Sequence, residues 1–137
     1  MRRARELGVV IGAGRSIIAV VATDAPLLPH QCRRPAQRAG LGVARVGGAG
    51  EHSSGDGFLA FSTANRGRLP ADGPTARSVR TYSVEILADR HIDPVFYGAI
   101  EATEEAIVNA LVTAETMTGR DGITAYALPR DALGAHQ

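Results

Sequence analysis

The feature that most constrains the fold is a short apolar run, rich in β-branched residues, at positions 17–22. Such a run is far shorter than the roughly 20 residues that a membrane helix needs. β-Branched side chains favour extended backbone, and a strand that is buried on both faces is apolar throughout instead of alternating. We therefore predict a strand over residues 16–23 in a sheet that is covered on both sides.

A serine at the head of this strand is the first candidate for chemistry. Ser16 follows the glycine-spaced stretch Gly12-Ala13-Gly14-Arg15. If the chain were cut before Ser16, one residue would carry both a hydroxyl nucleophile and an α-amine, whose pKa of about 7.7–8 makes it a usable base. The glycines do not predict a dinucleotide site, because such a site needs a helix directly after them and here a strand follows. Residues 1–15 are interpreted as a linker or ragged leader, and residues 16–137 as the folded portion.

Two long helices are predicted in the rest of the chain. The first is capped by Asp24 and ends at Gly40, and Pro35 is expected to kink or shorten it. The second runs from Asp93 to Gly119. Its apolar stripe consists of Phe96, Ile100, Thr103, Ile107, Leu111 and Ala114.

The remaining predicted elements are strands over 58–64, 79–87 and 123–128, a polar loop over 65–78 and a terminal helix from Pro129. Because strands alternate with helices, the chain is predicted to form an α/β layered domain. So small a sheet leaves open edges, which a partner chain or a missing segment is expected to complete.

Composition narrows the functional classes. The net charge is +1 and the 137 residues include no Trp, so nucleic-acid binding is not predicted. A single cysteine, Cys32, excludes an internal disulfide and is typical of a reducing compartment, so a cytoplasmic location is expected. Cys32 itself is interpreted as a small core residue. No membrane segment is predicted, and His30, His91 and His136 show no metal-ligand spacing among themselves.

A second group of small polar residues lies directly before the predicted strand at 58–64. The stretch Ser53-Ser54-Gly55-Asp56-Gly57 places a carboxylate next to two hydroxyls, an arrangement that could orient a proton relay. The same spacing is typical of a surface turn with an Asx-type hydrogen bond. On spacing alone, the turn is the favoured interpretation.

Four segments in this order resemble the D-aminopeptidase/β-peptidyl aminopeptidase family, which are self-cleaving enzymes of the L-aminopeptidase/D-esterase type. They are SIIAVVATDAPLLPHQ from Ser16, SSGDGFLAFSTAN from Ser53, EATEEAIVNAL from Glu101 and AETMTGRDG from Ala114. The resemblance runs from about Ser16 to Asp131, which is nearly the whole chain.

The resemblance implies an α-β-β-α sandwich like that of the N-terminal-nucleophile hydrolases, of which this chain would be only the C-terminal part, the β chain. Members of the family are made as longer precursors that cut themselves before a serine, and that serine corresponds to Ser16. A second serine and a carboxylate assist it, corresponding to Ser54 and Asp56. For that loop, the resemblance favours function over a plain turn. This sequence has Arg15 where the family usually has glycine before the cut.

The implied function is hydrolysis of amide or ester bonds at the amino end of short peptides or amino-acid amides, with no metal or cofactor. The implied partners are an α chain, either from the same precursor or a separate α-like chain, and further αβ units in a homo-oligomer. The alternative is a catalytically inactive, truncated fragment with only a structural or oligomerisation role.

Overall fold

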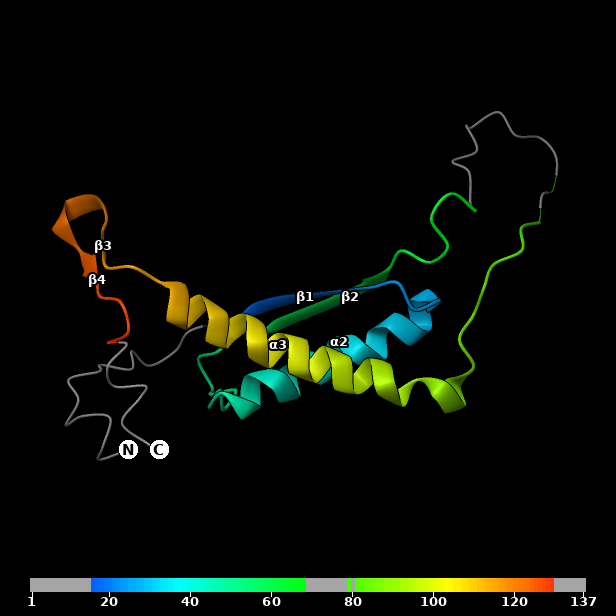
Figure 1. Ribbon diagram of the computed structural model, residues 1–137, viewed down its shortest axis with the longest axis horizontal. Helices are drawn as coiled ribbons and strands as arrows, with labels where there is room; N and C mark the ends of the chain where they lie inside the picture. The colour runs from blue at the N-terminus through cyan, green and yellow to red at the C-terminus, as the bar shows by residue number, and fades with distance from the viewer. Residues whose placement is uncertain (1–15, 69–78, 80, 130–137) are drawn as a thin grey trace.

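The computed structural model describes residues 16–68, 79 and 81–129. Its main elements alternate between strand and helix (Figure 1). They are β1 (Ile18–Thr23), α2 (Pro29–Arg45), β2 (Gly57–Ser62), α3 (Asp93–Thr113), β3 (Met117–Thr118) and β4 (Thr124–Ala125), with short 3₁₀ turns at Asp89–His91 and Arg120–Gly122. The predicted α/β class is confirmed. The leader at 1–15 and the body of the terminal helix predicted from Pro129 lie outside the described residues.

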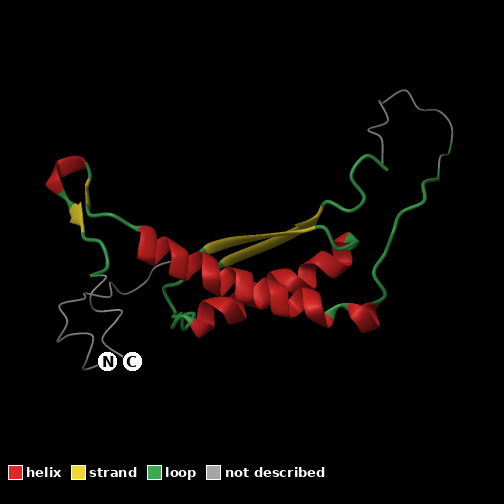
Figure 2. Cartoon of the chain, viewed as in Figure 1, coloured by secondary structure: helices red, strands yellow, loops and turns green. Residues whose placement is uncertain are grey.

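Strands β1 and β2 form a two-stranded parallel sheet in which Ile18 is paired with Gly57 and Thr23 with Ser62. Helices α2 and α3 pack against each other and lie on one side of this sheet (Figure 2). The core between them is small and contains Leu27, Cys32, Ile92 and Phe96. The described part of the chain is therefore one helical layer on one sheet layer.

The other face of the sheet is bare. The side chains of Ile18, Val20, Leu59 and Phe61 are respectively 79%, 57%, 58% and 45% exposed. We call these four residues the bare face. The prediction that the first strand is buried on both sides is therefore wrong, because helices cover only one side of it within the described part of the chain. Parallel sheets are normally covered on both faces, so this surface has the character of an interior.

The two helices cross closely because small residues face each other. Ala36, Ala39 and Gly42 of α2 are buried, as are Ala99 and Ile100 of α3. A methyl group added to Gly42 would lie 2.5 Å from the carbonyl oxygen of Ile100 and 2.7 Å from Cβ of Thr103. The backbones approach too closely there for any side chain.

Both predicted long helices exist, but with different ends. Helix α2 begins at Pro29 instead of near Asp24, passes through the buried Pro35 and continues beyond Gly40 to Arg45. The predicted stop at Gly40 is wrong because that residue packs in mid-helix against the Phe58 ring, 3.5 Å from an ideal Cβ. Pro35 is tolerated because its ring is fully buried, so packing offsets the hydrogen bond that proline cannot donate.

A buried glutamine, and not Asp24, organises the start of α2. The side-chain oxygen of Gln31 accepts a hydrogen bond from the Leu28 N–H at 3.1 Å. Its amide nitrogen donates to the Leu87 carbonyl at 2.8 Å and to Asp89 Oδ1 at 2.7 Å. Gln31 is only 1% exposed, so it joins the helix start to the segment that leads into α3.

The predicted strand at 79–87 is absent from its described residues, Val79 and 81–87. These residues lie outside any ladder, and the backbone of Glu85 pairs instead with the side chain of Asn65. That amide donates to the Glu85 carbonyl at 3.0 Å and accepts from the Glu85 N–H at 2.9 Å. A side chain thus takes the place that a neighbouring strand would fill.

Helix α3 ends at Thr113, earlier than the predicted Gly119. Phe96, Ile100 and Thr103 of its predicted stripe are buried, whereas Leu111 is 52% exposed. The chain then turns back through Asp121 and Gly122, both with positive φ, to form an antiparallel hairpin. Only Thr124–Ala125 of the predicted strand at 123–128 is paired, because its partner strand is equally short.

The close helix crossing gives a direct test of packing. We expect Gly42→Ala to lower the free energy of unfolding by about 1–3 kcal/mol, because its methyl group overpacks the crossing. Gly98→Ala is the matched control, since nothing lies within 4 Å of its added methyl. That change should raise stability by about 0.5–1 kcal/mol, the ordinary gain when alanine replaces a glycine in a helix. Urea denaturation measures both, and equal effects would contradict the crossing.

The buried cysteine gives a second test. Cys32 is 8% exposed, and burial raises the pKa of its thiol from the ordinary value of 9.0, partly opposed by a hydrogen bond from the Ser62 backbone. The unfolded chain therefore loses this proton first as the pH rises. The contribution of the thiol to stability is present below about pH 9 and is lost above it.

We accordingly expect Cys32 to react with an aromatic disulfide reagent far more slowly in the native chain than in urea. We also expect Cys32→Ala to remove the part of the stability loss seen above about pH 9. Denaturation curves of both chains at neutral and alkaline pH make the measurement. Rapid native labelling would show that the thiol is not in the core.

Candidate functional site

The parallel pairing of β1 and β2 brings the sequence-predicted site residues to one edge of the sheet. Ser16 precedes β1 by two residues, and Ser54, Gly55 and Asp56 directly precede β2. Because Ile18 is paired with Gly57, the residues before each strand also lie side by side. Segments almost forty residues apart in sequence therefore meet at the amino ends of the two strands.

The hydroxyl of Ser16 contacts the backbone of the second segment. The Gly55 N–H donates a hydrogen bond to Ser16 Oγ at 2.9 Å. A Cβ on residue 55 would lie 3.3 Å from the same oxygen, tighter than most such contacts. Glycine at this position thus allows the loop to approach the serine.

The carboxylate of Asp56 joins the two segments a second time. Its Oδ1 accepts a hydrogen bond from the Ile17 N–H at 3.2 Å and one from the Ser54 hydroxyl at 2.5 Å. Asp56 therefore holds the Ser54 side chain and the residue that follows Ser16 in one network. The network contains a carboxylate and a hydroxyl close to the Ser16 side chain. Groups of this kind can carry a proton to and from a nucleophile.

The edge is open in this chain. Ser16, Gly55 and Asp56 are exposed and Ser54 is half-buried. The bare face begins beside it, at Ile18. Hydrogen bonds gain strength when water is excluded, so the network would be strengthened by whatever covers this surface.

Among the described residues, no group of three His, Cys, Asp or Glu side chains is placed to hold a metal ion. No helix in that part of the chain has both the length and the apolar character needed to cross a membrane. The predictions of no cofactor and of a cytoplasmic location stay predictions.

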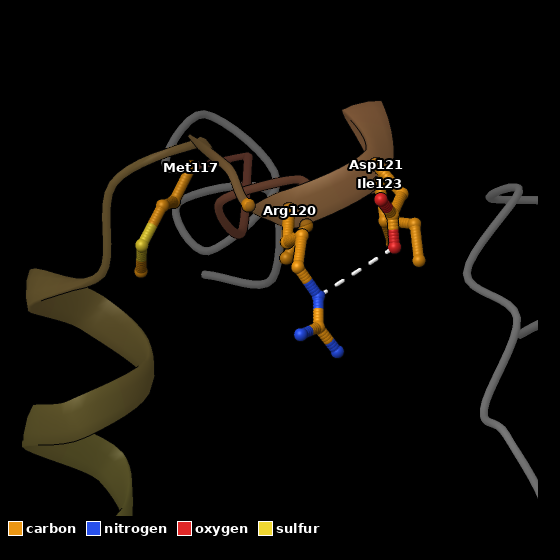
Figure 3. Close-up of a pocket in the computed structure, with 6 residues that line it drawn as sticks. Met117, Arg120, Asp121 and Ile123 are labelled. Carbon is orange, nitrogen blue, oxygen red and sulfur yellow. Dashed lines mark ion pairs between the residues drawn. The ribbon is translucent and has the colours of Figure 1, made fainter.

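A hollow of about 350 Å³ lies elsewhere, on the β3–β4 hairpin. Figure 3 shows Met117 and Ile123 at its wall, with the Arg120 guanidinium reaching toward Asp121 at 3.6 Å. The lining contains no hydroxyl or thiol nucleophile. The serine edge, and not this hollow, is therefore the candidate active site.

The structure thus brings together Ser16, Ser54 and Asp56, while their catalytic roles stay predictions. Sequence reasoning missed two main-chain groups of the network, the N–H of Gly55 and that of Ile17. A glycine between a serine and an aspartate was the available signal for the first of these. Nothing in the local sequence indicates the second, because it depends on the pairing of two distant strands.

The sequence and the structure are both similar to those of known peptidases. The sequence matches peptidase family S58 over residues 2–125, a span that includes most of the predicted leader. It is 48% identical over 128 residues to the β-peptidyl aminopeptidase BapA of Sphingosinicella microcystinivorans. The match covers 93% of this chain but 31% of that protein, so this chain spans about a third of its relative.

Two solved structures of aminopeptidases are similar to this chain in fold. A Burkholderia sp. β-aminopeptidase has a TM-score of 0.78 and 51% identity, over 86% of this chain and 33% of its own. The L-aminopeptidase D-Ala-esterase/amidase of Ochrobactrum anthropi, described as a variant of the Ntn hydrolase fold, has a TM-score of 0.73 and 42% identity, over 86% and 32%. The helical layer and the sheet described above are therefore one portion of that fold. This chain belongs to peptidase family S58.

Proposed function

We propose that this chain is the nucleophile-bearing portion of a serine aminopeptidase that hydrolyses amide or ester bonds at the amino end of short peptides. The observation that carries the proposal is the hydrogen-bonded edge at which Ser16 meets Ser54, Gly55 and Asp56. Membership of a peptidase family supports it. So do the names of the relatives, a β-peptidyl aminopeptidase and an L-aminopeptidase D-Ala-esterase/amidase.

The proposed reaction has two steps. The Ser16 oxygen forms a bond to the acyl carbon, and its proton passes through the Ser54 hydroxyl toward the Asp56 carboxylate and on to the leaving amine. Water then attacks the acyl-serine, and the Ser16 oxygen leaves and regains a proton. The same attack on the carbonyl of Arg15 would break the Arg15–Ser16 amide bond, free the α-amine of Ser16 and leave an ester on its oxygen. Water would then hydrolyse that ester and cut the chain before Ser16.

We further propose that a second polypeptide segment, corresponding to the two-thirds of its relatives that this chain does not span, covers the bare face. Four large apolar side chains on one side of a parallel sheet are the support for this interface. Two sheets packed face to face lie about 10 Å apart with their side chains interdigitated. Such a layer would also shield the nearby serine edge from water.

The catalytic proposal is tested by co-expressing this chain with the missing two-thirds of the Sphingosinicella microcystinivorans relative. We expect mass spectrometry to show a new amino terminus at Ser16. We also expect the purified complex to hydrolyse one or more members of a panel of L-, D- and β-amino-acid anilides.

Variants then separate the roles. Ser16→Ala should abolish both cleavage and hydrolysis, whereas Ser54→Ala and Asp56→Asn should lower kcat by about 10²–10⁴-fold, the usual contribution of a proton-transfer group. Ser53→Ala is the matched control and should keep full activity, since the predicted relay does not include it. A stable complex that neither cuts at Ser16 nor hydrolyses any anilide would instead support the inactive fragment.

The bare face gives a separate prediction. We expect Leu59→Lys to abolish co-purification with the second segment, because a charge would be buried at the centre of the interface. The stability of the isolated chain should change by no more than about 0.5 kcal/mol, since Leu59 is already 58% exposed. Leu41→Lys on α2, at 54% exposure, is the control and should leave co-purification intact. Equal binding by both variants would place the interface elsewhere.

A further inference from the structure

We infer that the main-chain N–H of Gly55 is a working part of the nucleophile, where it stabilises negative charge on Ser16 Oγ. The inference rests on the proposed function and adds a group to it. Its basis is the direct hydrogen bond of 2.9 Å from this N–H to the hydroxyl oxygen. A donor aimed at an oxygen where charge develops stabilises the charged form more than the neutral one.

The Gly55 N–H donates to Ser16 and does not take part in holding the Asp56 carboxylate. The neighbouring Ser54 hydroxyl and the Ile17 N–H both point to Asp56 Oδ1, so those two groups hold the carboxylate. Gly55 lies between Ser54 and Asp56 in sequence, and both flanking side chains belong to that network. The loop is therefore fixed on each side of the peptide group that faces Ser16.

The strand ladder fixes the same loop from the other end. The Gly57 N–H donates to the Ile17 carbonyl at 2.9 Å, and the Ile17 N–H donates to Asp56. Both segments are therefore held in register on either side of the Gly55 contact. A donor held in this way needs little reorganisation when charge appears on the oxygen, which is the condition for effective electrostatic stabilisation.

The N–H acts in both chemical steps. In acylation, the Ser16 oxygen carries negative charge as its proton leaves, and the N–H stabilises that charge until the electron pair has formed the bond to the acyl carbon. In deacylation, the bond from that oxygen to the acyl carbon breaks, and the electron pair returns to the oxygen beside the same donor before a proton is regained. One fixed group therefore serves the attacking and the leaving oxygen, because the two are the same atom.

The requirement for glycine follows from the same contact. A methyl group at residue 55 would lie 3.3 Å from the Ser16 oxygen, which is tighter than most such contacts. A side chain would move the loop back and lengthen the hydrogen bond. Glycine here supplies an unobstructed N–H instead of an unusual backbone conformation.

The hydrogen bond is tested first without any activity. In the ¹⁵N-labelled full chain, we expect the Gly55 amide proton to resonate downfield of its position in Ser16→Ala, which lacks the acceptor. The Gly57 amide, bonded to a carbonyl, should be the same in both chains. An unchanged Gly55 signal would overturn the inference.

Its chemical effect is tested by replacing one peptide N–H with an ester oxygen, through incorporation of glycolic acid at position 55. The readout is the rate of Ser16 modification by phenylmethylsulfonyl fluoride as a function of pH, in the co-expressed complex. We expect the rate to fall by about 10- to 100-fold, the range for a lost hydrogen bond to a charged group. We also expect its rise with pH to move to more alkaline values. Glycolic acid at position 57 is the comparison, because it removes a neutral ladder hydrogen bond to the Ile17 carbonyl. It should lower the rate by less than about tenfold and leave the pH dependence where it is in wild type.

The outcomes separate this inference from the function beneath it. A wild-type serine that reacts equally well with glycolic acid at position 55 overturns the role of Gly55 and leaves the nucleophile in place. A wild-type serine that does not react at all overturns the nucleophile, and the role of Gly55 with it. An equal loss at positions 55 and 57 would mean that the loop is only a structural support, which also contradicts the inference.

Discussion

The parallel pairing of β1 and β2 is the interaction on which the candidate site depends. Neither strand carries a candidate site residue within its ladder, yet the register sets which of the preceding residues lie side by side at the shared edge. The contacts of Gly55 with Ser16 and of Asp56 with Ile17 are continuations of that register beyond the last ladder pair. The positions of the candidate site residues are therefore set by the pairing of the two strands that follow them.

The helical layer holds the sheet from one side only. Close packing at Gly42 and the buried Gln31 fix α2 against α3 and against the segment that leads into it. Aromatic and cationic groups add to this, since the guanidinium groups of Arg34 and Arg38 lie 4.8 Å and 4.2 Å from the centre of the Phe96 ring. These contacts stabilise the layer behind the sheet but contribute nothing to its bare face. The chain is thus well packed on one side and open on the other.

Local sequence patterns predicted the main elements, because strand and helix periodicity are local properties. The first strand, both long helices and the core position of Cys32 follow from such patterns. The ends of α2 did not, since Gln31 replaces Asp24 as the group that organises its start through residues more than fifty positions away. The predicted strand at 79–87 is absent for a similar reason, because the side chain of Asn65 forms hydrogen bonds with the backbone of Glu85.

The candidate site could be named from the sequence only through family resemblance. Spacing alone favoured a plain turn at Ser54 and Asp56, because nothing near them in sequence indicates that Ser16 lies beside them. The first strand is apolar on both of its sides, but the described residues cover only one of them. An apolar pattern on a strand indicates that its face is normally buried, but it does not indicate which segment buries it.

The bare face has a consequence for the alignment of the serine edge. Side chains alternate between the two faces of a strand, so a slip of one residue exchanges the faces. The inner side of β2 carries Phe58 and the outer side Phe61, and the inner side of β1 carries Val21 and the outer side Val20. Because both sides of these strands carry apolar groups and only one side is covered, a slip costs less free energy than in a strand with one apolar and one polar side. A slipped pair would move Gly55 away from Ser16, so any layer that covers the sheet would also keep the Ser16 hydroxyl and the Gly55 N–H in line.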